Sequence, residues 1–240
     1  MKIVAITSFN QKYYDLIGKD SVDSFLRYWP TNISITCYIE DMILNPIDRL
    51  NIIDFSELCN QYQEFQNSNQ RPRVKIFAKK AYSIIHAMEN IDCDFLIWLD
   101  ADTITTQQVN LKQITSLCQS NDLATFMGVY HNKNNQTYFS AETGFFILNK
   151  NHKGFTDFSN RYREYYDKRL TEKLRRFYDG EVFGAVVKDL EHKYEFNDMC
   201  LKFNKQYKTP LRRTTVGKFL HHYKAKSTKD KFIANKFLDD

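Results

Sequence analysis

Five large apolar residues, Phe95 to Leu99, run directly into Asp100-Ala101-Asp102. A short apolar run bounded by polar residues is typical of a strand that is buried inside a sheet. Sheets of this kind have helices on their faces, so the run favours an α/β fold. Ligands bind at the carboxyl ends of the strands in such folds, and this strand ends in two carboxylates.

The rest of the chain alternates between strand and helix patterns. Strands are predicted at 1–7, 33–39, 94–99, 123–127 and 145–148, and helices at 21–29, 47–66, 74–90 and near 110–119, 155–170 and 180–189. The sequence shows no internal repeat and no linker rich in Pro, Gly or Ser. Alternating strands and helices predict one α/β domain with a mainly parallel central sheet.

The 240 residues suit a single domain, and the hydrophobic (42%) and aromatic (15%) contents exclude wholesale disorder. The longest apolar run, Phe95 to Leu99, is far shorter than the ~20 residues of a membrane span. The chain opens without a visible secretory signal, and its five cysteines are scattered, with no Cys-x-x-Cys pair. We therefore expect a cytoplasmic protein with reduced thiols and no transmembrane segment.

Positive charge is concentrated late in the chain. Residues 201–240 hold 11 of the 34 Lys and Arg residues but only 3 of the 29 Asp and Glu residues, so this segment carries +8 and the first 200 residues carry −3. A field of this sign favours an anionic partner. Nucleic acid, membrane headgroups and a phosphorylated small molecule all stay open at this point.

Asp100 and Asp102 are two residues apart, so both carboxylates can face the same way where the chain is still extended. Hard divalent cations such as Mn²⁺ and Mg²⁺ take oxygen ligands, commonly one or two carboxylates together with phosphate oxygens of a substrate. The pair therefore predicts a Mn²⁺ or Mg²⁺ site that also binds a diphosphate. The alternative is a solvated acidic turn, and the five apolar residues that lead into the pair favour the metal site.

The element from Trp98 to Thr103 (Trp-Leu-Asp-Ala-Asp-Thr) resembles the Asp-x-Asp motif of nucleotide-sugar-dependent glycosyltransferases with the GT-A fold, and it is most similar to bacterial and phage members. The resemblance extends over nearly the whole chain through short motifs in the same order. It implies one GT-A (Rossmann-like) domain, 1–240, with a mainly parallel mixed sheet flanked by helices. It further implies a nucleotide-binding half (1–110) and a half that binds the acceptor and closes the donor site (111–240).

The same resemblance assigns roles around the acidic motif. It implies that Asp102 is a direct metal ligand, and that Asp100 contacts the donor and stands with Asp102 in the metal site. Further side chains are implied to complete the donor site: Thr7, Ser8 and Asn10 after the first strand, Asp41 after the second strand, and Lys80 on the helix before the motif.

Two further motifs are implied to border the donor sugar. The segment from Ser140 to Asn149 resembles the family's Glu-x-Gly element, with Glu142 as a sugar contact or base and Gly144 as a point of close backbone approach before a strand. Asp179 precedes an apolar run, as is typical of a helix N-cap. The resemblance implies that Asp179 is the general base if the reaction inverts the sugar's configuration.

The sequence from Leu220 to Lys229 accounts for part of the basic segment. The resemblance implies that His222 is the third metal ligand and that Lys224 and Lys226 contact the diphosphate. Imidazole is a suitable ligand for divalent metals. Ala225 stands where the family usually has a glycine, so the identity of the phosphate-binding lysine stays open.

Together these motifs predict a metal-dependent glycosyltransferase, with a hexosyltransferase and a UDP-sugar donor favoured. The acceptor would be a hydroxyl group of a sugar, a lipid-linked molecule or a protein. One alternative is a phosphatase of the haloacid-dehalogenase type, but its motif carries Thr or Val where this chain has Ile104. The other is a nucleic-acid-binding protein, but the sequence shows no RNP, KH, zinc or helix-turn-helix signature, so no nucleic acid partner is expected.

Overall fold

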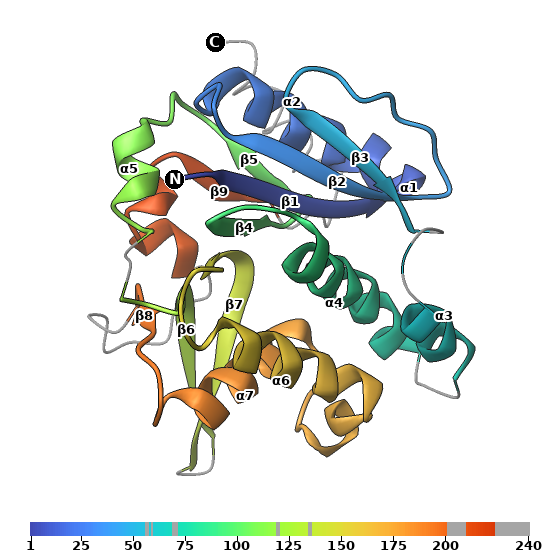
Figure 1. Cartoon of the computed structure of the whole chain (residues 1–240), viewed down its shortest axis with the longest axis vertical. Helices are drawn as coiled ribbons and strands as arrows, with labels where there is room; N and C mark the ends of the chain where they lie inside the picture. Colours follow the sequence, from blue (N-terminus) through green and yellow to red (C-terminus); the bar gives the residue numbers. More distant parts are fainter. Residues whose placement is uncertain are drawn as a thin grey trace.

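Strand β4 (Phe95–Leu99) occupies the middle of a seven-stranded sheet with the order β3-β2-β1-β4-β7-β6-β8 (Figure 1). The structure, a computed structural model, describes residues 1–55, 58, 60–68, 72–118, 121–133, 136–200 and 210–223. The other strands of the sheet are β1 (Ile3–Asn10), β2 (Ser34–Glu40), β3 (Leu50–Asp54), β6 (Ala124–Lys133), β7 (Gln136–Asn149) and β8 (Asn197–Asp198). Two further strands, β5 (Thr103–Thr105) and β9 (Leu220–His222), form a separate ribbon.

The sheet is mixed. β1 pairs in parallel with both β2 and β4, and β2 pairs in parallel with β3. β7 runs antiparallel to both β4 and β6, and β8 is parallel to β6. The α/β class and the mainly parallel mixed sheet expected from the sequence are therefore confirmed.

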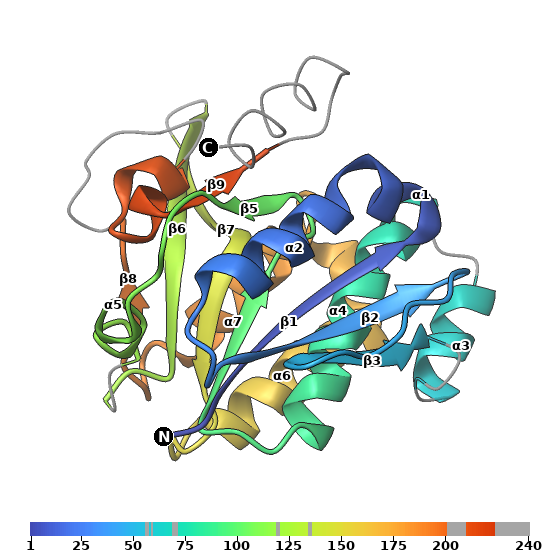
Figure 2. The same ribbon diagram turned by 90° about the horizontal axis from the view of Figure 1, so that it is seen from above.

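Helices cover both faces of the sheet (Figures 1 and 2). One face carries α2 (Lys19–Tyr28), and the other carries α4 (Pro72–Asn90), α6 (Phe155–Asp167) and α7 (Asp179–Leu190). Side chains alternate along β1, so its even-numbered apolar residues join the core under α4 and its odd-numbered ones join the core under α2. The remaining helical elements are short: α1 (Gln11–Tyr13), η1 (Tyr14–Gly18), α3 (Asn60–Asn67), α5 (Leu111–Thr115), η3 (Leu170–Lys173), η4 (Pro210–Arg213) and η5 (Val216–Lys218).

Two further findings concern membrane-spanning helices and the state of the cysteines. Among the described helices, none combines the length and the apolar character needed to cross a bilayer. Four cysteines are buried free thiols, and Cys59 lies outside the described residues.

Two predicted boundaries differ from the structure. The helix predicted over 47–66 is wrong in its first part, because Leu50–Asp54 forms strand β3 and α3 begins only at Asn60. The two β-branched isoleucines of this segment suit a strand, and pairing with β2 decides its conformation. The first strand, predicted to end at Thr7, continues to Asn10 because β2 pairs with it over that whole length.

Strand β7 is longer than predicted and irregular beside β6. Glu142 and Gly144, expected before a strand, lie inside β7. Thr125 pairs with Ile147 but Met127 pairs with Glu142, so a step of two residues in β6 corresponds to a step of five in β7. The excess of three is an odd number, and an odd shift turns the following side chains to the opposite face. This bulge therefore decides the direction in which Glu142 and its neighbours point.

Candidate active site

Asp100 lies at the end of β4, on the face of the sheet that α4 covers. Side chains two residues apart on a strand share a face, and the Trp98 indole Nε1 donates a hydrogen bond to Asp100 Oδ1 (2.7 Å). Lys80 reaches the same oxygen from α4, with its Nζ 2.6 Å away. Trp98 and Lys80 thus fix the carboxylate so that its other oxygen, Oδ2, faces His222.

Asp102 lies in the turn after β4 and meets a residue from far along the chain. β5 begins at Thr103 and pairs with β9, so that Thr103 is opposite His222. This pairing brings His222 Nε2 to 2.9 Å from Asp102 Oδ1 and 3.7 Å from Asp100 Oδ2. The Tyr223 backbone N–H donates to the Asp102 carbonyl (2.7 Å), which holds the two segments together.

Asp100, Asp102 and His222 form a group that we call the Asp-Asp-His group. Each residue offers one ligand atom, and the three atoms lie within 4.8 Å of one another. The Tyr13 hydroxyl donates to Asp102 Oδ2 (3.0 Å), so Oδ1 is the oxygen that faces His222. Two carboxylates and one imidazole suit a divalent cation that accepts both oxygen and nitrogen ligands. The residues predicted as metal ligands therefore fit such an ion.

The carboxylates around His222 change its ionisation. Burial opposes the charged imidazolium, but the hydrogen bond and charge of Asp102, with the charges of Asp100 and Glu142, raise the pKa of His222 to about 9. The imidazole therefore carries a proton at neutral pH when no cation is bound. A divalent cation would replace this proton, because only the neutral imidazole acts as a ligand.

Lys80 joins the half-buried carboxylate of Asp100 to the buried carboxylate of Asp179. Its Nζ lies 2.6 Å from Asp100 Oδ1 and 2.6 Å from Asp179 Oδ2, and it donates to the Thr143 carbonyl (2.8 Å). Burial alone would raise the pKa of Asp179, but Lys80 and the Thr143 hydroxyl (2.5 Å) hold it below its usual value. Burial raises the pKa of Asp100 in spite of Lys80. Lys80 therefore balances part of the negative charge of these two carboxylates, and its predicted donor contact stays a prediction.

The local role of Asp179 differs from the sequence prediction. The N-cap of α7 is Tyr178, and Asp179 is the first helical residue. Its carboxylate is held by Lys80 and Thr143. A carboxylate in an ion pair with a lowered pKa is a weak base. The catalytic role of Asp179 stays a prediction, as does that of Glu142.

Gly144 allows His222 to lie against β7. A Cβ at this position would lie 2.9 Å from His222 Nδ1 and 3.3 Å from Glu142 Oε1. Glu142 Oε1 lies 3.5 Å from His222 Nδ1 and accepts a hydrogen bond from the Gly144 N–H (3.3 Å). The predicted close approach at Gly144 is thus occupied by the imidazole of the Asp-Asp-His group.

We expect Gly144→Ala to weaken Mn²⁺ binding by about 10–100-fold, the usual effect of disturbing a residue that orients a metal ligand. The added methyl group would displace His222, and titration calorimetry with Mn²⁺ measures the loss. Gly18→Ala is the control, because its Cβ would lie at an ordinary contact distance of 3.4 Å from Phe9. Equal Mn²⁺ affinities of wild type and Gly144→Ala would contradict the assignment of His222 as a ligand.

A cleft of about 290 Å³ opens beside these residues. Its lining residues include Glu142, Thr143, Asp179, Arg176 and Tyr178. Since Glu142 also contacts His222, a molecule in this cleft would lie next to the Asp-Asp-His group.

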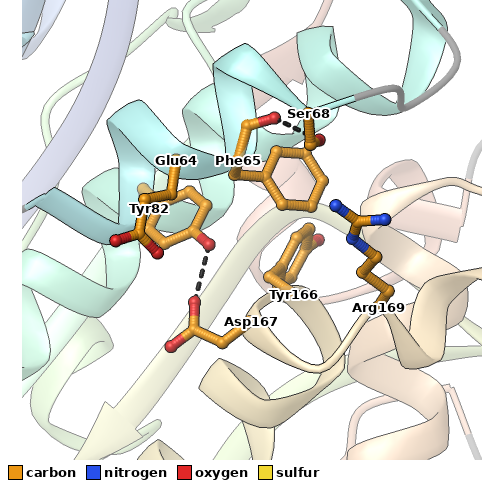
Figure 3. Close-up of a pocket in the computed structure, with 7 residues that line it drawn as sticks. All are labelled: Glu64, Phe65, Ser68, Tyr82, Tyr166, Asp167 and Arg169. Carbon is orange, nitrogen blue, oxygen red and sulfur yellow. Dashed lines mark hydrogen bonds between the residues drawn. The ribbon is translucent and has the colours of Figure 1, made fainter.

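A second cavity, about 150 Å³ in volume, lies among α3, α4 and the end of α6 (Figure 3). Its lining residues are Glu64, Phe65, Ser68, Tyr82, Tyr166, Asp167 and Arg169. The Tyr82 hydroxyl donates to Asp167 (2.7 Å), and the Ser68 hydroxyl donates to the Phe65 carbonyl (2.6 Å). None of these residues belongs to the Asp-Asp-His group, so the larger cleft is the one that adjoins the candidate metal site.

The residues after β1 and β2 that were predicted to complete the donor site differ from one another in burial and contacts. Thr7 is buried, and its hydroxyl oxygen has no hydrogen-bond partner among the described residues. Ser8 is half-buried in β1, and Asn10 caps α1 by accepting from the Tyr13 N–H (2.9 Å). Asp41 is exposed and has a positive φ of 55°. Their donor contacts stay predictions.

The structure brings in two residues that the sequence motifs did not identify. Tyr13 and Thr143 hold Asp102 and Asp179, respectively, through their hydroxyl groups. Thr143 lies between Glu142 and Gly144 in a predicted motif, so its position in the sequence could have identified it as a site residue. Tyr13 lies in no predicted motif. The predicted diphosphate contacts, Lys224 and Lys226, lie outside the described residues.

No protein-family model and no curated protein sequence matches the chain. Solved structures do match it. One is the glycosyltransferase GlyE of Streptococcus pneumoniae TIGR4, with 13% identity and a TM-score of 0.55, over 100% of this chain and 60% of GlyE. A second is mouse xyloside xylosyltransferase 1 in its apo form, with 11% identity and a TM-score of 0.56, over 92% of this chain and 97% of that one.

A third is the galactosyltransferase LgtC in complex with donor and acceptor sugar analogues, with 13% identity and a TM-score of 0.56, over 98% of this chain and 94% of that one. The chain thus spans nearly the full length of two of these enzymes and less than two thirds of GlyE. At such identities the likeness concerns the fold. This chain has the GT-A fold of these glycosyltransferases.

Proposed function

We propose that this protein is a metal-dependent glycosyltransferase that moves a sugar from a nucleoside-diphosphate sugar to a hydroxyl group of an acceptor. One observation carries the proposal: the ligand atoms of Asp100, Asp102 and His222 converge at the carboxyl end of β4. This is the end of the sheet at which α/β folds bind ligands. The fold shared with glycosyltransferases agrees with it.

In this proposal the Asp-Asp-His group holds Mn²⁺ or Mg²⁺. The bound ion would neutralise the negative charge that develops on the departing diphosphate. Tyr13 and Trp98 orient the two aspartates through their hydrogen bonds, and Lys80 balances the charge of Asp100 and Asp179. The donor favoured is a UDP-sugar, and the cleft beside Glu142 admits the acceptor.

A thermal-shift experiment tests this proposal. We expect Mn²⁺ and a nucleoside diphosphate together to raise the Tm by more than the sum of their separate effects, because each ligand completes the binding site of the other. UDP, GDP, ADP and CDP are compared at one concentration. Hydrolysis of the corresponding nucleotide sugars with Mn²⁺ is then measured. Cleavage of phosphomonoesters without binding or turnover of any nucleotide sugar would overturn the proposal.

A further inference from the structure

The cleft beside the Asp-Asp-His group has a second wall of a different character. Arg176, Tyr178 and Glu181 line it from the start of α7 and the segment before it, and His131 and Ser140 line it from β6 and β7. Arg176 is exposed, whereas Glu181 is buried. The wall therefore includes a guanidinium that is exposed to solvent.

Aromatic stacking fixes this wall. The rings of His131 and Tyr138 stack, with centroids 4.5 Å apart and planes at 10°. The Arg175 guanidinium carbon lies over the same Tyr138 ring, 3.9 Å from its centroid. Two groups this close to one ring must occupy its opposite faces, so Tyr138 is held between them. His131 Nε2 also lies 2.9 Å from Ser140 Oγ, which joins the stack to β7.

The guanidinium groups of Arg175 and Arg176 form no ion pair with another described residue. In the part of the chain that the structure describes, no carboxylate lies within 4.0 Å of a guanidinium nitrogen of Arg175 or Arg176. Two of the acids that line the cleft are already engaged: Asp179 pairs with Lys80, and Glu142 lies beside His222.

The electrostatic field of the two arginines reaches into the cleft. Burial lowers the pKa of His131, and Arg176 and Arg175 lower it further. Burial raises the pKa of Glu181, whereas Arg176 and Arg175 oppose this rise. His131, Glu181 and Arg176 all line the cleft, so the positive charge of the arginines acts on groups of its lining.

We infer that this cleft binds the acceptor of the proposed transfer, and that the acceptor carries an anionic group, a carboxylate or a phosphate, that pairs with Arg176. The inference rests on the proposed function. Arginine suits this task because its planar guanidinium binds the oxygens of carboxylates and phosphates in pairs. The stacked Arg175 adds positive charge from a fixed position.

The test compares matched pairs of small acceptors. Methyl glycosides of glucose, galactose and mannose are each offered beside the corresponding uronic acid and the corresponding 6-phosphate. The full chain is first saturated with Mn²⁺ and the nucleoside diphosphate that gives the largest thermal shift, so that anions cannot occupy the donor site. Ligand-observed NMR titration gives the Kd of each compound. The carboxylate and phosphate arms show which anion is preferred.

We expect the anionic member of at least one pair to bind about tenfold or more tightly than its neutral partner, the effect of one charge-assisted hydrogen bond. In Arg176→Gln this ratio should fall to near unity, and in Arg176→Lys to an intermediate value. Because the ratio is measured within one protein, a general loss of folding does not imitate it. Lys173→Gln, which removes an exposed charge from the same segment outside the cleft, should keep the wild-type ratio.

Equal binding within every pair, or no binding by any anionic member, would overturn the inference. So would a preference for anions that survives unchanged in Arg176→Gln. Hydrolysis of the nucleotide sugar separates this failure from failure of the proposed function. If hydrolysis proceeds, only the acceptor inference is wrong; if no nucleotide sugar is bound or hydrolysed, the proposed function itself is wrong.

Discussion

Asp102→Asn should lower kcat/KM for nucleotide-sugar turnover by about three orders of magnitude, because loss of metal-supported charge stabilisation costs several kcal/mol. Asp102 is buried, its Oδ1 faces His222 Nε2 at 2.9 Å, and Tyr13 holds its other oxygen. Asparagine keeps the shape and can keep the Tyr13 contact, but it removes the charge that a divalent cation needs. Titration calorimetry with Mn²⁺ should show the loss of affinity directly.

The control for this variant is Asp92→Asn, which makes the same chemical change at the surface. Asp92 pairs with Lys2 in an exposed ion pair, and such pairs contribute little to stability. We expect this variant to keep wild-type Mn²⁺ affinity and turnover. If Asp102→Asn keeps the combined thermal shift of Mn²⁺ and nucleoside diphosphate, the Asp-Asp-His group is not the metal site.

Lys80→Met should produce the largest loss of stability among single changes near the site. The Lys80 side chain is 12% exposed and lies 2.6 Å from both Asp100 and Asp179. Methionine would fill a similar volume but leave the half-buried Asp100 and the buried Asp179 without their common cation. Removal of one partner from a buried ion pair costs about 3–5 kcal/mol. Urea unfolding at neutral pH measures the change in the free energy of unfolding.

The adjacent lysine supplies a matched control. Lys79 forms an ion pair with Glu40 nearer the surface, with its side chain 32% exposed. Lys79→Met should change the free energy of unfolding by less than about 1 kcal/mol. Adding Asp179→Asn to Lys80→Met should restore part of the lost stability, because it removes one of the uncompensated charges. Similar small losses in both lysine variants would show that Lys80 does not hold the two carboxylates together.

The centre of the fold could be predicted from the sequence because its signals are local. The apolar run up to Leu99 predicted β4, and the spacing of Asp100 and Asp102 predicted two carboxylates together at the end of that strand. The same reasoning failed at 50–54, where two isoleucines suit a strand but the pairing with β2 decides the conformation. The sequence pattern of one segment does not show which strand that segment will pair with.

The rest of the candidate site depends on long-range register. His222 was predicted only through resemblance to a family, since no property of the residue itself places it opposite Thr103. The bulge in β7, which sets the direction of Glu142, arises from the offset between two strands and leaves no trace in composition. Tyr13 reaches Asp102 because a short helix follows β1, and a tyrosine at that position has many other possible roles.

The pairing of β5 with β9 has a consequence for how the protein is made. Asp102 and His222 are 120 positions apart in the chain, at 102 and 222. Contacts over such a separation are slow to form, because closing a long loop costs conformational entropy before any contact is gained. Asp100 and Asp102 are synthesised well before His222, and the pairing that brings His222 to them forms late in folding. The proposed cation site is therefore complete only in the finished molecule, and its assembly would mark the completion of folding.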